Sequence, residues 1–313
     1  MSESSNEAAE PKKPKLQLET LSAADHATRF DPAQYLNGFY STAQQDDAMS
    51  LVLFFLPGII YRLPWIYSKE GEEEEVAMLD VGSGPTVHVA VAFRRAGVGR
   101  IYLSDFAERN RRELTKFTLN EKERFDWSKV ICWLASIEGR GDGVDVGAVE
   151  EETRRRICGV LCCDLQTSDK EEVLSPTGPE TFVDDAQRFQ DDFASGFNLV
   201  TSTFCAEYTC ETEEAYDRAL ANLVSLVKPG GYLLMAGVFE SRNYYFGTTK
   251  FNCYYLTRTK LRQALTQLGM QTRFPHSAEG DGVSSGKDDQ SLRFVEYEGI
   301  FILTARKPAE QCE

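Results

Sequence analysis

Three segments carry residue types that could bind a nucleoside-like ligand. The first is the turn Gly82-Ser83-Gly84-Pro85-Thr86, which follows the apolar run Val76–Val81. Glycines in such a turn let the backbone approach a ligand closely because they carry no Cβ. The other two are the acidic residues Asp105 and Asp164, each at the end of a short apolar run. Asp105 could accept hydrogen bonds from ribose hydroxyls, and Asp164 could accept one from an adenine amino group while Leu165 packs on the ring.

The glycine pattern separates two classes of cofactor. A dinucleotide-binding turn has a third glycine in the order G-x-G-x-x-G, and Val87 stands at that position here. S-adenosylmethionine needs a glycine turn for its amino-acid end but carries no pyrophosphate. The pattern therefore favours S-adenosylmethionine as the cofactor over a nicotinamide dinucleotide, and it argues against the alternative of a dinucleotide-dependent oxidoreductase.

Strands and helices alternate around these segments. We expect strands at Val76–Val81, Arg100–Ser104, Lys129–Ala135, Val160–Cys163, Phe197–Cys205 and Tyr232–Val238, and an antiparallel strand at or near the sheet edge within Arg293–Lys307. We expect helices at Ala48–Tyr67, Val87–Ala96, Ala107–Glu121, Val149–Cys158, Glu213–Val227 and Leu256–Gly269. Alternation with short links predicts an α/β fold with a mostly parallel central sheet and helices on both faces. The carboxyl ends of the strands then bring Asp105, Asp164, Thr203, Phe204 and Glu207 to one edge.

Composition limits the partners. The net charge of −15 argues against nucleic acid and anionic membranes, and the apolar run Leu51–Ile60 is too short to span a bilayer. Eight cysteines form no C-x-x-C pair and only three histidines are present, so we expect no metal site. We expect a monomer with free thiols in the cytoplasm, acting on a small molecule.

The chain divides into segments of different character. We expect a disordered polar segment at 1–25, in which Pro11–Lys15 is alternatively a nuclear address, and a tail at 309–313. Between them, 26–308 forms a single domain with an aromatic helical lid at 26–70. Acidic loop insertions are expected at 138–148, 168–193 and 276–291.

Several motifs occur together in a fixed order. They are F-D-P-A-Q-Y-L-N-G-F-Y from Phe30, L-D-V-G-S-G-P-T from Leu79, D-F-A-E-R-N from Asp105, F-D-W-S from Phe125, C-D-L, T-S-T-F-C, L-V-K-P-G-G-Y-L and E-G-I-F-I-L-T-A-R-K. The region from Phe30 to Lys307 resembles the small-molecule N-methyltransferases that include the nicotinamide, phenylethanolamine and indolethylamine enzymes. The resemblance implies a Rossmann-like, class I S-adenosylmethionine-dependent methyltransferase fold.

The resemblance also implies residues that hold the cofactor. Tyr35 and Tyr40 would close over it, and Thr203 would contact it from the fourth main strand. The remaining cofactor residues implied are Gly82, Ser83, Gly84, Thr86, His88, Asp105, Asn110, Asp164 and Leu165. His88 departs from the family pattern, in which this position usually carries tyrosine.

The resemblance gives mixed indications about the residues that would bind the methyl acceptor. Glu207, Gly237 and Glu240 resemble the phenylethanolamine enzyme, in which carboxylates orient an ammonium and relay its proton, whereas Ser241 resembles the nicotinamide enzyme. Gly237 replaces an aspartate that holds the amide of nicotinamide, and an amide-binding serine is lost near Cys253. Substrate contacts are also expected from Phe204, Tyr245 and Glu296, and catalytic roles from Glu207, Glu240 and Tyr35.

These patterns favour N-methylation of a small amine. Nicotinamide or another pyridine is the alternative acceptor, and a cofactor-binding protein without turnover is a further alternative.

Overall fold

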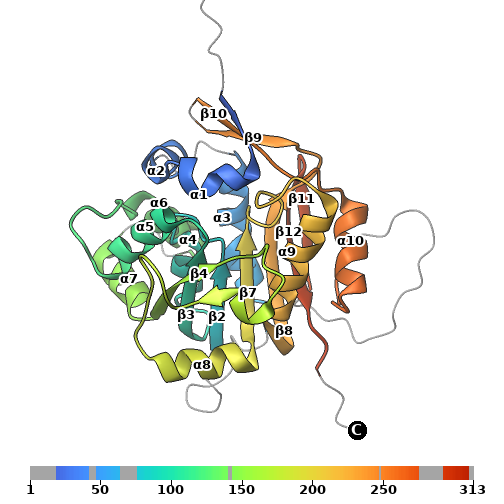
Figure 1. Ribbon diagram of the computed structural model, residues 1–313. Helices are drawn as coiled ribbons and strands as arrows, with labels where there is room; N and C mark the ends of the chain where they lie inside the picture. Colours follow the sequence, from blue (N-terminus) through green and yellow to red (C-terminus); the bar gives the residue numbers. More distant parts are fainter. Residues whose placement is uncertain are drawn as a thin grey trace, which may run out of the picture.

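A largely parallel sheet forms the centre of the protein (Figure 1). The computed structural model describes residues 19–41, 47–63, 76–139, 143–246, 248–274 and 292–309. Within these ranges the main sheet has the order β11-β12-β8-β7-β2-β3-β4-β5, and β6 pairs with β4. Its strands are β2 (Val76–Val81), β3 (Val98–Asp105), β4 (Ile157–Cys163), β5 (Leu174–Ser175), β6 (Phe182–Val183), β7 (Phe197–Thr203), β8 (Val227–Val238), β11 (Phe294–Tyr297) and β12 (Ile300–Arg306).

The strand directions confirm the predicted Rossmann-like α/β class. The pairs β2–β3, β3–β4, β2–β7 and β7–β8 are parallel, whereas β12 runs antiparallel to β8 and pairs with β11 in an edge hairpin. The chain therefore builds outward from β2 first through β3 and β4, and then in the other direction through β7 and β8. Ligands of open α/β sheets bind at the carboxyl ends of the strands, where the strand order reverses in this way.

Helices cover both faces, as predicted. They are α3 (Asp47–Ile60), α4 (His88–Phe93), α5 (Glu108–Thr118), α6 (Ser128–Ile137), α7 (Val146–Arg154), α8 (Ala186–Ser195), α9 (Glu213–Ser225) and α10 (Arg258–Gln267). Successive side chains of β2 point to opposite faces: Met78 belongs to the core shared with α3 to α7, and Leu79 to the core shared with α8 to α10. None of the described helices is long and apolar enough to cross a membrane.

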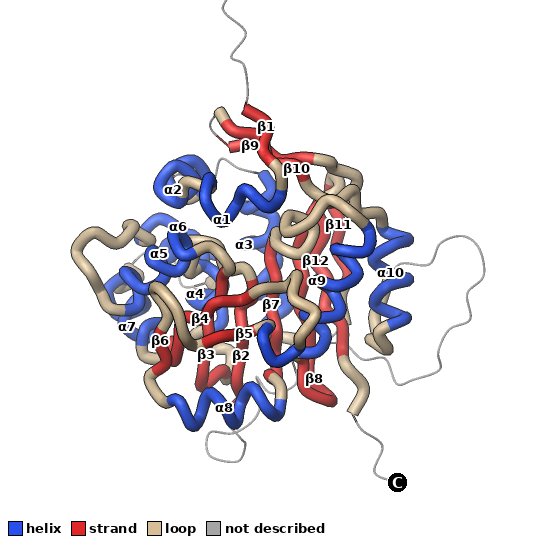
Figure 2. Tube along the Cα trace, in the orientation of Figure 1, coloured by secondary structure: helices blue, strands red, loops and turns tan. Residues whose placement is uncertain are grey.

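A small cap lies above the edge where the parallel strands end (Figure 2). It consists of the sheet β1 (Glu19–Leu21), β10 (Thr249–Asn252) and β9 (Asn243–Phe246), the turn η1 (Ala23–Asp25), and the helices α1 (His26–Arg29) and α2 (Pro32–Phe39). β1 pairs with β10 in parallel, with Leu21 opposite Phe251. The prediction of disorder is therefore wrong for 19–25, where sheet pairing with a distant segment orders the chain.

Two further expectations are corrected. Lys129–Ala135 is not a strand but lies in α6, because its buried residues Val130, Ile131, Leu134 and Ala135 follow helical spacing. The insertion 168–193 is not irregular: it contains η3 (Lys170–Glu172), β5, β6 and most of α8, whose Asp185 accepts a hydrogen bond from the Arg188 amide at 3.0 Å.

Other boundaries move by a few residues. β8 begins at Val227 rather than Tyr232, and α4 begins at His88 rather than Val87. The insertion 138–148 ends in the first turn of α7. Residues 276–291, parts of the predicted lid and the tail after 309 lie outside the described residues.

Candidate active site

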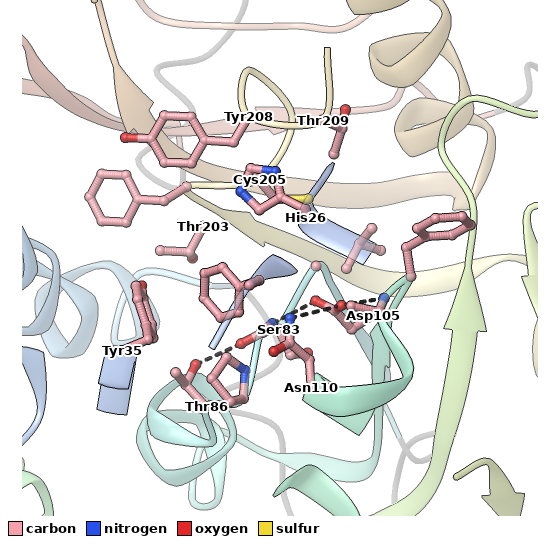
Figure 3. A pocket seen from close by; sticks show the side chains of 18 of the residues that line it. His26, Tyr35, Ser83, Thr86, Asp105, Asn110, Thr203, Cys205, Tyr208 and Thr209 are labelled. Carbon is pink, nitrogen blue, oxygen red and sulfur yellow. Dashed lines mark hydrogen bonds between the residues drawn. The ribbon is translucent and has the colours of Figure 1, made fainter. Parts of the chain in front are cut away.

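A cavity of about 530 Å³ opens between the cap and the carboxyl edge of the sheet. Its wall comes from the turn after β2, from the ends of β3, β4, β7 and β8, and from α1, α2 and β9 of the cap. This is the edge at which the strand order reverses, and the volume is typical of sites for small molecules. Figure 3 shows the side chains that line it.

The glycine turn brings backbone to the cavity without side chains. Gly82 and Gly84 have φ angles of +68° and +61°, which favour glycine. A Cβ on Gly82 would lie 2.0 Å from Sγ of Cys205, whereas one on Gly84 would project into open space. The turn is fixed by Thr86, whose hydroxyl donates to the carbonyl of Ser83 at 2.7 Å. The four turn residues singled out from the sequence, Gly82, Ser83, Gly84 and Thr86, all line the cavity.

Asp105 ends β3 and links the glycine turn to the next helix. Its carboxylate accepts hydrogen bonds from the amides of Gly84 (2.9 Å) and Ala107 (2.8 Å) and from Nδ2 of Asn110 (3.1 Å). Burial raises the pKa of Asp105, and these hydrogen bonds oppose that shift. Asp105 and Asn110 both line the cavity and lie side by side in Figure 3.

Two further strand ends contribute as predicted. Asp164 follows β4, and its carboxylate accepts a hydrogen bond from the Gln166 amide at 2.8 Å, which leaves buried Leu165 between them on the cavity wall. Thr203 and Phe204 follow from β7, and Phe204 turns the chain with a φ of +51°.

His88 and Tyr40 meet beneath the cap. Nδ1 of His88 lies 3.1 Å from Oγ1 of Thr86 and 3.4 Å from the Tyr40 hydroxyl. Thr86 spends its hydrogen on Ser83 and can only accept from Nδ1, whereas the Tyr40 hydroxyl can donate to Nδ1 or accept from it. Burial lowers the pKa of His88 to about 3, so the ring is neutral.

Some buried polar atoms of the cavity wall have no hydrogen-bond partner among the described residues, and they show what kind of ligand the wall could bind. Nε2 of His88, Oδ1 of Asn110 and Oγ1 of Thr203 are buried and have no hydrogen-bond partner in the described part of the chain. Buried polar groups are nearly always hydrogen-bonded, so a ligand with hydroxyl and amino groups would complete this wall. With the carboxylate of Asp105 and the open space at Gly84, the residues present fit S-adenosylmethionine.

The other end of the cavity is aromatic. Tyr208 and Tyr244 stack with ring centroids 4.3 Å apart, and Tyr35 packs against Phe30 at 5.1 Å. His26 from α1 lies in the same group of rings. In Figure 3 Tyr208 and His26 lie in the upper half of the view, opposite Ser83, Thr86 and Asn110. We call this aromatic part the acceptor end, as distinct from the cofactor end at the glycine turn.

A profile of the NNMT/PNMT/TEMT family matches residues 18–308. The chain belongs to this family. It is therefore an S-adenosylmethionine-dependent N-methyltransferase of small molecules, and the family, enzyme class and methyl donor predicted from the motifs are confirmed.

Three relatives illustrate the similarity. A nicotinamide N-methyltransferase of Caenorhabditis elegans is 35% identical over 299 residues, covering 95% of this chain and 96% of the relative. The nicotinamide N-methyltransferase of Homo sapiens is 29% identical over 282 residues, covering 90% and 94%. The phenylethanolamine N-methyltransferase of Bos taurus is 28% identical over 283 residues, covering 89% of each chain.

The carboxylates expected at the acceptor end of this family member lie elsewhere. Glu207 is 1% exposed and does not line the cavity; its Oε1 accepts a hydrogen bond from the Val238 amide at 2.9 Å. Burial raises the pKa of Glu207 to about 7. The carboxylate lies against the backbone of Gly237, where a Cβ would be 2.4 Å from Oε1. Gly237 therefore makes room for Glu207 and does not contact the cavity.

Glu240 and Glu296 are also outside the cavity. Both pair with Arg258 of α10, Glu240 through Nη1 at 2.9 Å and Glu296 through Nε at 2.6 Å. Glu240 is turned outward by a φ of +58° and is half exposed. The sequence predicts the helix that carries Arg258 but not its position beside β8 and β11, and the ion pairs with Arg258 hold both carboxylates away from the cavity.

Of the two remaining residues expected to contact the substrate, one lines the cavity and the other does not. Tyr245 lines the cavity rim and is half exposed, whereas the Ser241 hydroxyl donates to the Asn243 carbonyl at 2.7 Å and is not on the wall. Tyr244, beside Tyr245 in the sequence, also lines the cavity. His26 and Tyr208 line it without a sequence signal, because nothing in the local pattern around them distinguishes them from core residues.

Proposed function

We propose that this enzyme transfers a methyl group to the ring nitrogen of a small, uncharged aromatic heterocycle of the pyridine class. One observation carries the proposal: the acceptor end is built from aromatic rings, and the carboxylates among the described lining residues, Asp80, Asp105 and Asp164, belong to the cofactor end. A protonated amine placed among the rings would have no carboxylate of a described lining residue to pair with, which is costly in a buried site.

Methylation of a ring nitrogen requires fewer catalytic groups from the protein than methylation of an amine. A pyridine nitrogen is already neutral at pH 7, so no proton has to be removed before its lone pair attacks. Bound S-adenosylmethionine supplies an activated methyl group on sulfur. The protein then needs to hold and orient the acceptor, and orientation alone can lower a barrier by about 7–11 kcal/mol. Rings such as Tyr35, Tyr208 and Phe204 supply flat apolar surfaces for that purpose.

The cofactor would be held by residues at the strand ends. We assign Asp105 and Asn110 to the ribose hydroxyls, and Asp164 with Leu165 to the adenine. The glycine turn, His88 and Tyr40 are assigned to the amino-acid end, with Thr203 between the two ends of the cavity. The partner-free atoms of Asn110, His88 and Thr203 support this assignment.

A small arylalkylamine is the second candidate acceptor. Glu207, with its raised pKa of about 7, lies directly behind the strand that carries Val238 to the cavity. The similarity to the bovine phenylethanolamine enzyme agrees with this candidate, while the higher identity to the C. elegans nicotinamide enzyme agrees with the first. A role of Glu207 in proton relay would require its carboxylate to leave the Val238 amide.

The test is methyl transfer from labelled S-adenosylmethionine to nicotinamide, phenylethanolamine, tryptamine and simple aliphatic amines, read by mass spectrometry. Methylation of nicotinamide with little methylation of amines is expected. Methylation of amines alone, lost in E207Q, would replace the first candidate by the second. Binding of S-adenosylhomocysteine without methylation of any compound would favour a protein without turnover.

We further propose that the enzyme acts as a monomer in the cytoplasm and binds neither nucleic acid nor membranes. The net charge of −15 supports the absence of nucleic-acid and membrane binding, because binders of phosphate-rich surfaces are basic. We also propose that 26–308, extended at its start by β1 and η1, forms one methyltransferase domain. Sedimentation equilibrium and cell fractionation test the first proposal, and the cofactor affinity of a chain that starts at residue 18 tests the second.

A further inference from the structure

Arg111 lies in an uncommon place for a charged side chain. It is near the start of α5 and is only 4% exposed, although helix N-termini favour negative charge and arginine is rarely buried without partners. Four hydrogen bonds hold its guanidinium. Nη1 donates to the carbonyl oxygens of Asp105 (3.0 Å) and Phe106 (2.6 Å), and Nε and Nη2 donate to that of Pro179 (3.2 and 3.0 Å). Arg111 therefore joins two segments that are far apart in the sequence.

The first segment is the end of β3, which carries Asp105. The Asp105 carboxylate accepts hydrogen bonds from the Gly84 amide and from Nδ2 of Asn110, so Arg111 at its carbonyl oxygen holds the same residue from the other side. Arg111 is not on the cavity wall, whereas its neighbour Asn110 is. Because successive side chains of a helix point in different directions, anchoring Arg111 away from the cavity directs Asn110 into it.

The second segment is the loop 176–181, which connects β5 to β6. Both strands pair with β4, the strand that ends just before Asp164. The loop is closed by the Thr181 hydroxyl, which donates to the Gly178 carbonyl at 2.8 Å. Arg111 thus adds a second link between the ends of β3 and β4, beyond their own pairing, at the edge where Asp105 and Asp164 face the cavity.

We propose that Arg111 is a positioning residue for the methyl donor, which holds the end of β3 against the loop 176–181 so that Asp105 and Asn110 face the ribose hydroxyls. This inference rests on the proposed assignment of these two residues to the ribose. A guanidinium has donors on three nitrogen atoms in one plane and reaches both segments at once, whereas the ammonium of lysine is a single point of charge. Loss of Arg111 should therefore weaken recognition of the ribose.

Two ligands separate this role from a general effect on the fold. S-adenosylhomocysteine and an analogue that lacks both ribose hydroxyls differ at the ribose alone, so the ratio of their affinities measures ribose recognition. We would titrate both calorimetrically into the wild type, R111Q, R111K and D105A. R112Q is the matched control, because Arg112 is the next residue of α5 and contacts the same loop through an exposed pair with Glu180 at 2.7 Å.

The wild type and R112Q should bind S-adenosylhomocysteine about tenfold or more tightly than the analogue, as for hydrogen bonds to a charged group. R111Q and R111K should lose roughly tenfold of that preference, within the usual range for coupling between sites. Their affinity for the analogue should stay unchanged, which also shows that they are folded. If one of the two variants does not fold, the other decides.

The outcomes distinguish this inference from the ribose assignment on which it rests. A preference that is kept in the Arg111 variants but lost in D105A would refute the inference and retain the assignment. Equal losses for both ligands would show that Arg111 only stabilises the fold, and would refute the inference as well. Equal binding of the two ligands by the wild type, or binding of neither, would refute the ribose assignment together with the inference.

Discussion

The carboxyl group of Glu207 occupies the space that a side chain at position 237 would need. A Cβ built on Gly237 would lie 2.4 Å from Oε1 of Glu207, closer than such contacts occur. The same oxygen accepts the Val238 amide hydrogen at 2.9 Å, which joins the end of β7 to the end of β8. The residue types at 207 and 237 are therefore physically coupled, and this coupling decides whether a carboxylate reaches the acceptor end.

We predict that G237A destabilises the protein by about 1–3 kcal/mol, as is usual for overpacking. Shortening the opposing side chain should relieve part of the clash, so E207D/G237A should be less destabilised than the sum of the two single changes. Urea unfolding of the four proteins measures this. G38A is the control, because a Cβ on Gly38 in α2 meets no atom within 4 Å. Additive effects within about 0.5 kcal/mol would show that the positions are independent.

Glu207 should also make stability depend on pH. Its pKa rises from the usual 4.5 to about 7 on folding, because the carboxyl is buried. Between these values the unfolded chain releases the proton while the folded chain keeps it. The contribution of Glu207 to the free energy of unfolding is therefore fully present below pH 4.5. It is lost as the pH rises to 7, and the free energy of unfolding falls by about 3 kcal/mol in total.

The matching variant is E207Q, whose side chain stays neutral. Comparing wild type with E207Q cancels the contribution of other titrating groups such as Asp80. The difference in unfolding free energy between the two proteins should therefore change across pH 4.5–7. A difference that does not vary with pH would mean that Glu207 is ionised in the folded protein, and would strengthen the case for a proton-relay role.

Loss of Asp105 should weaken the cofactor site. The D105A change removes the acceptor shared by the Gly84 amide and Asn110, so both the turn and the ribose contacts are affected. We expect at least a tenfold loss of S-adenosylhomocysteine affinity by calorimetry, about the effect of one charge-assisted hydrogen bond. Glu108 is exposed in the next helix, so E108Q serves as the control. Equal affinities in D105A and the wild type would contradict the ribose assignment.

Glu240 should not be required for methyl transfer. Its carboxylate pairs with Arg258 at the surface, so E240Q and R258Q should each alter kcat/KM less than twofold and stability by less than about 1 kcal/mol. Steady-state rates with both nicotinamide and phenylethanolamine check this. A large loss with the amine alone would show that Glu240 leaves Arg258 when an acceptor binds.

Features encoded by local sequence were predictable. The glycine turn, the strand before it and the aspartates at the ends of β3 and β4 each depend on neighbours within a few residues. Once a parallel sheet is inferred, its topology alone brings Asp105, Asp164 and Thr203 together. The sequence therefore places these residues at one edge of the sheet, and their contacts with the cofactor stay a prediction.

The acceptor end could not be predicted from the sequence, because it depends on contacts between distant segments. His26 enters the site only because β1 pairs with β10, and Glu207 and Glu240 avoid it because Gly237 and Arg258 offer other places. The misassigned segment that forms α6 has a different cause: a short apolar run such as Val130–Ala135 suits a buried strand and a buried helix equally well.

The pairing of β1 with β10 also sets an order for assembly during synthesis. Leu21 finds its partner Phe251 only after more than two hundred further residues have been translated. The methyl-donor end is built from segments that emerge earlier, whereas the wall made by His26 and Tyr244 can close only after β9 and β10 have been translated. A nascent chain would thus acquire the ability to bind its cofactor before it can choose what to methylate.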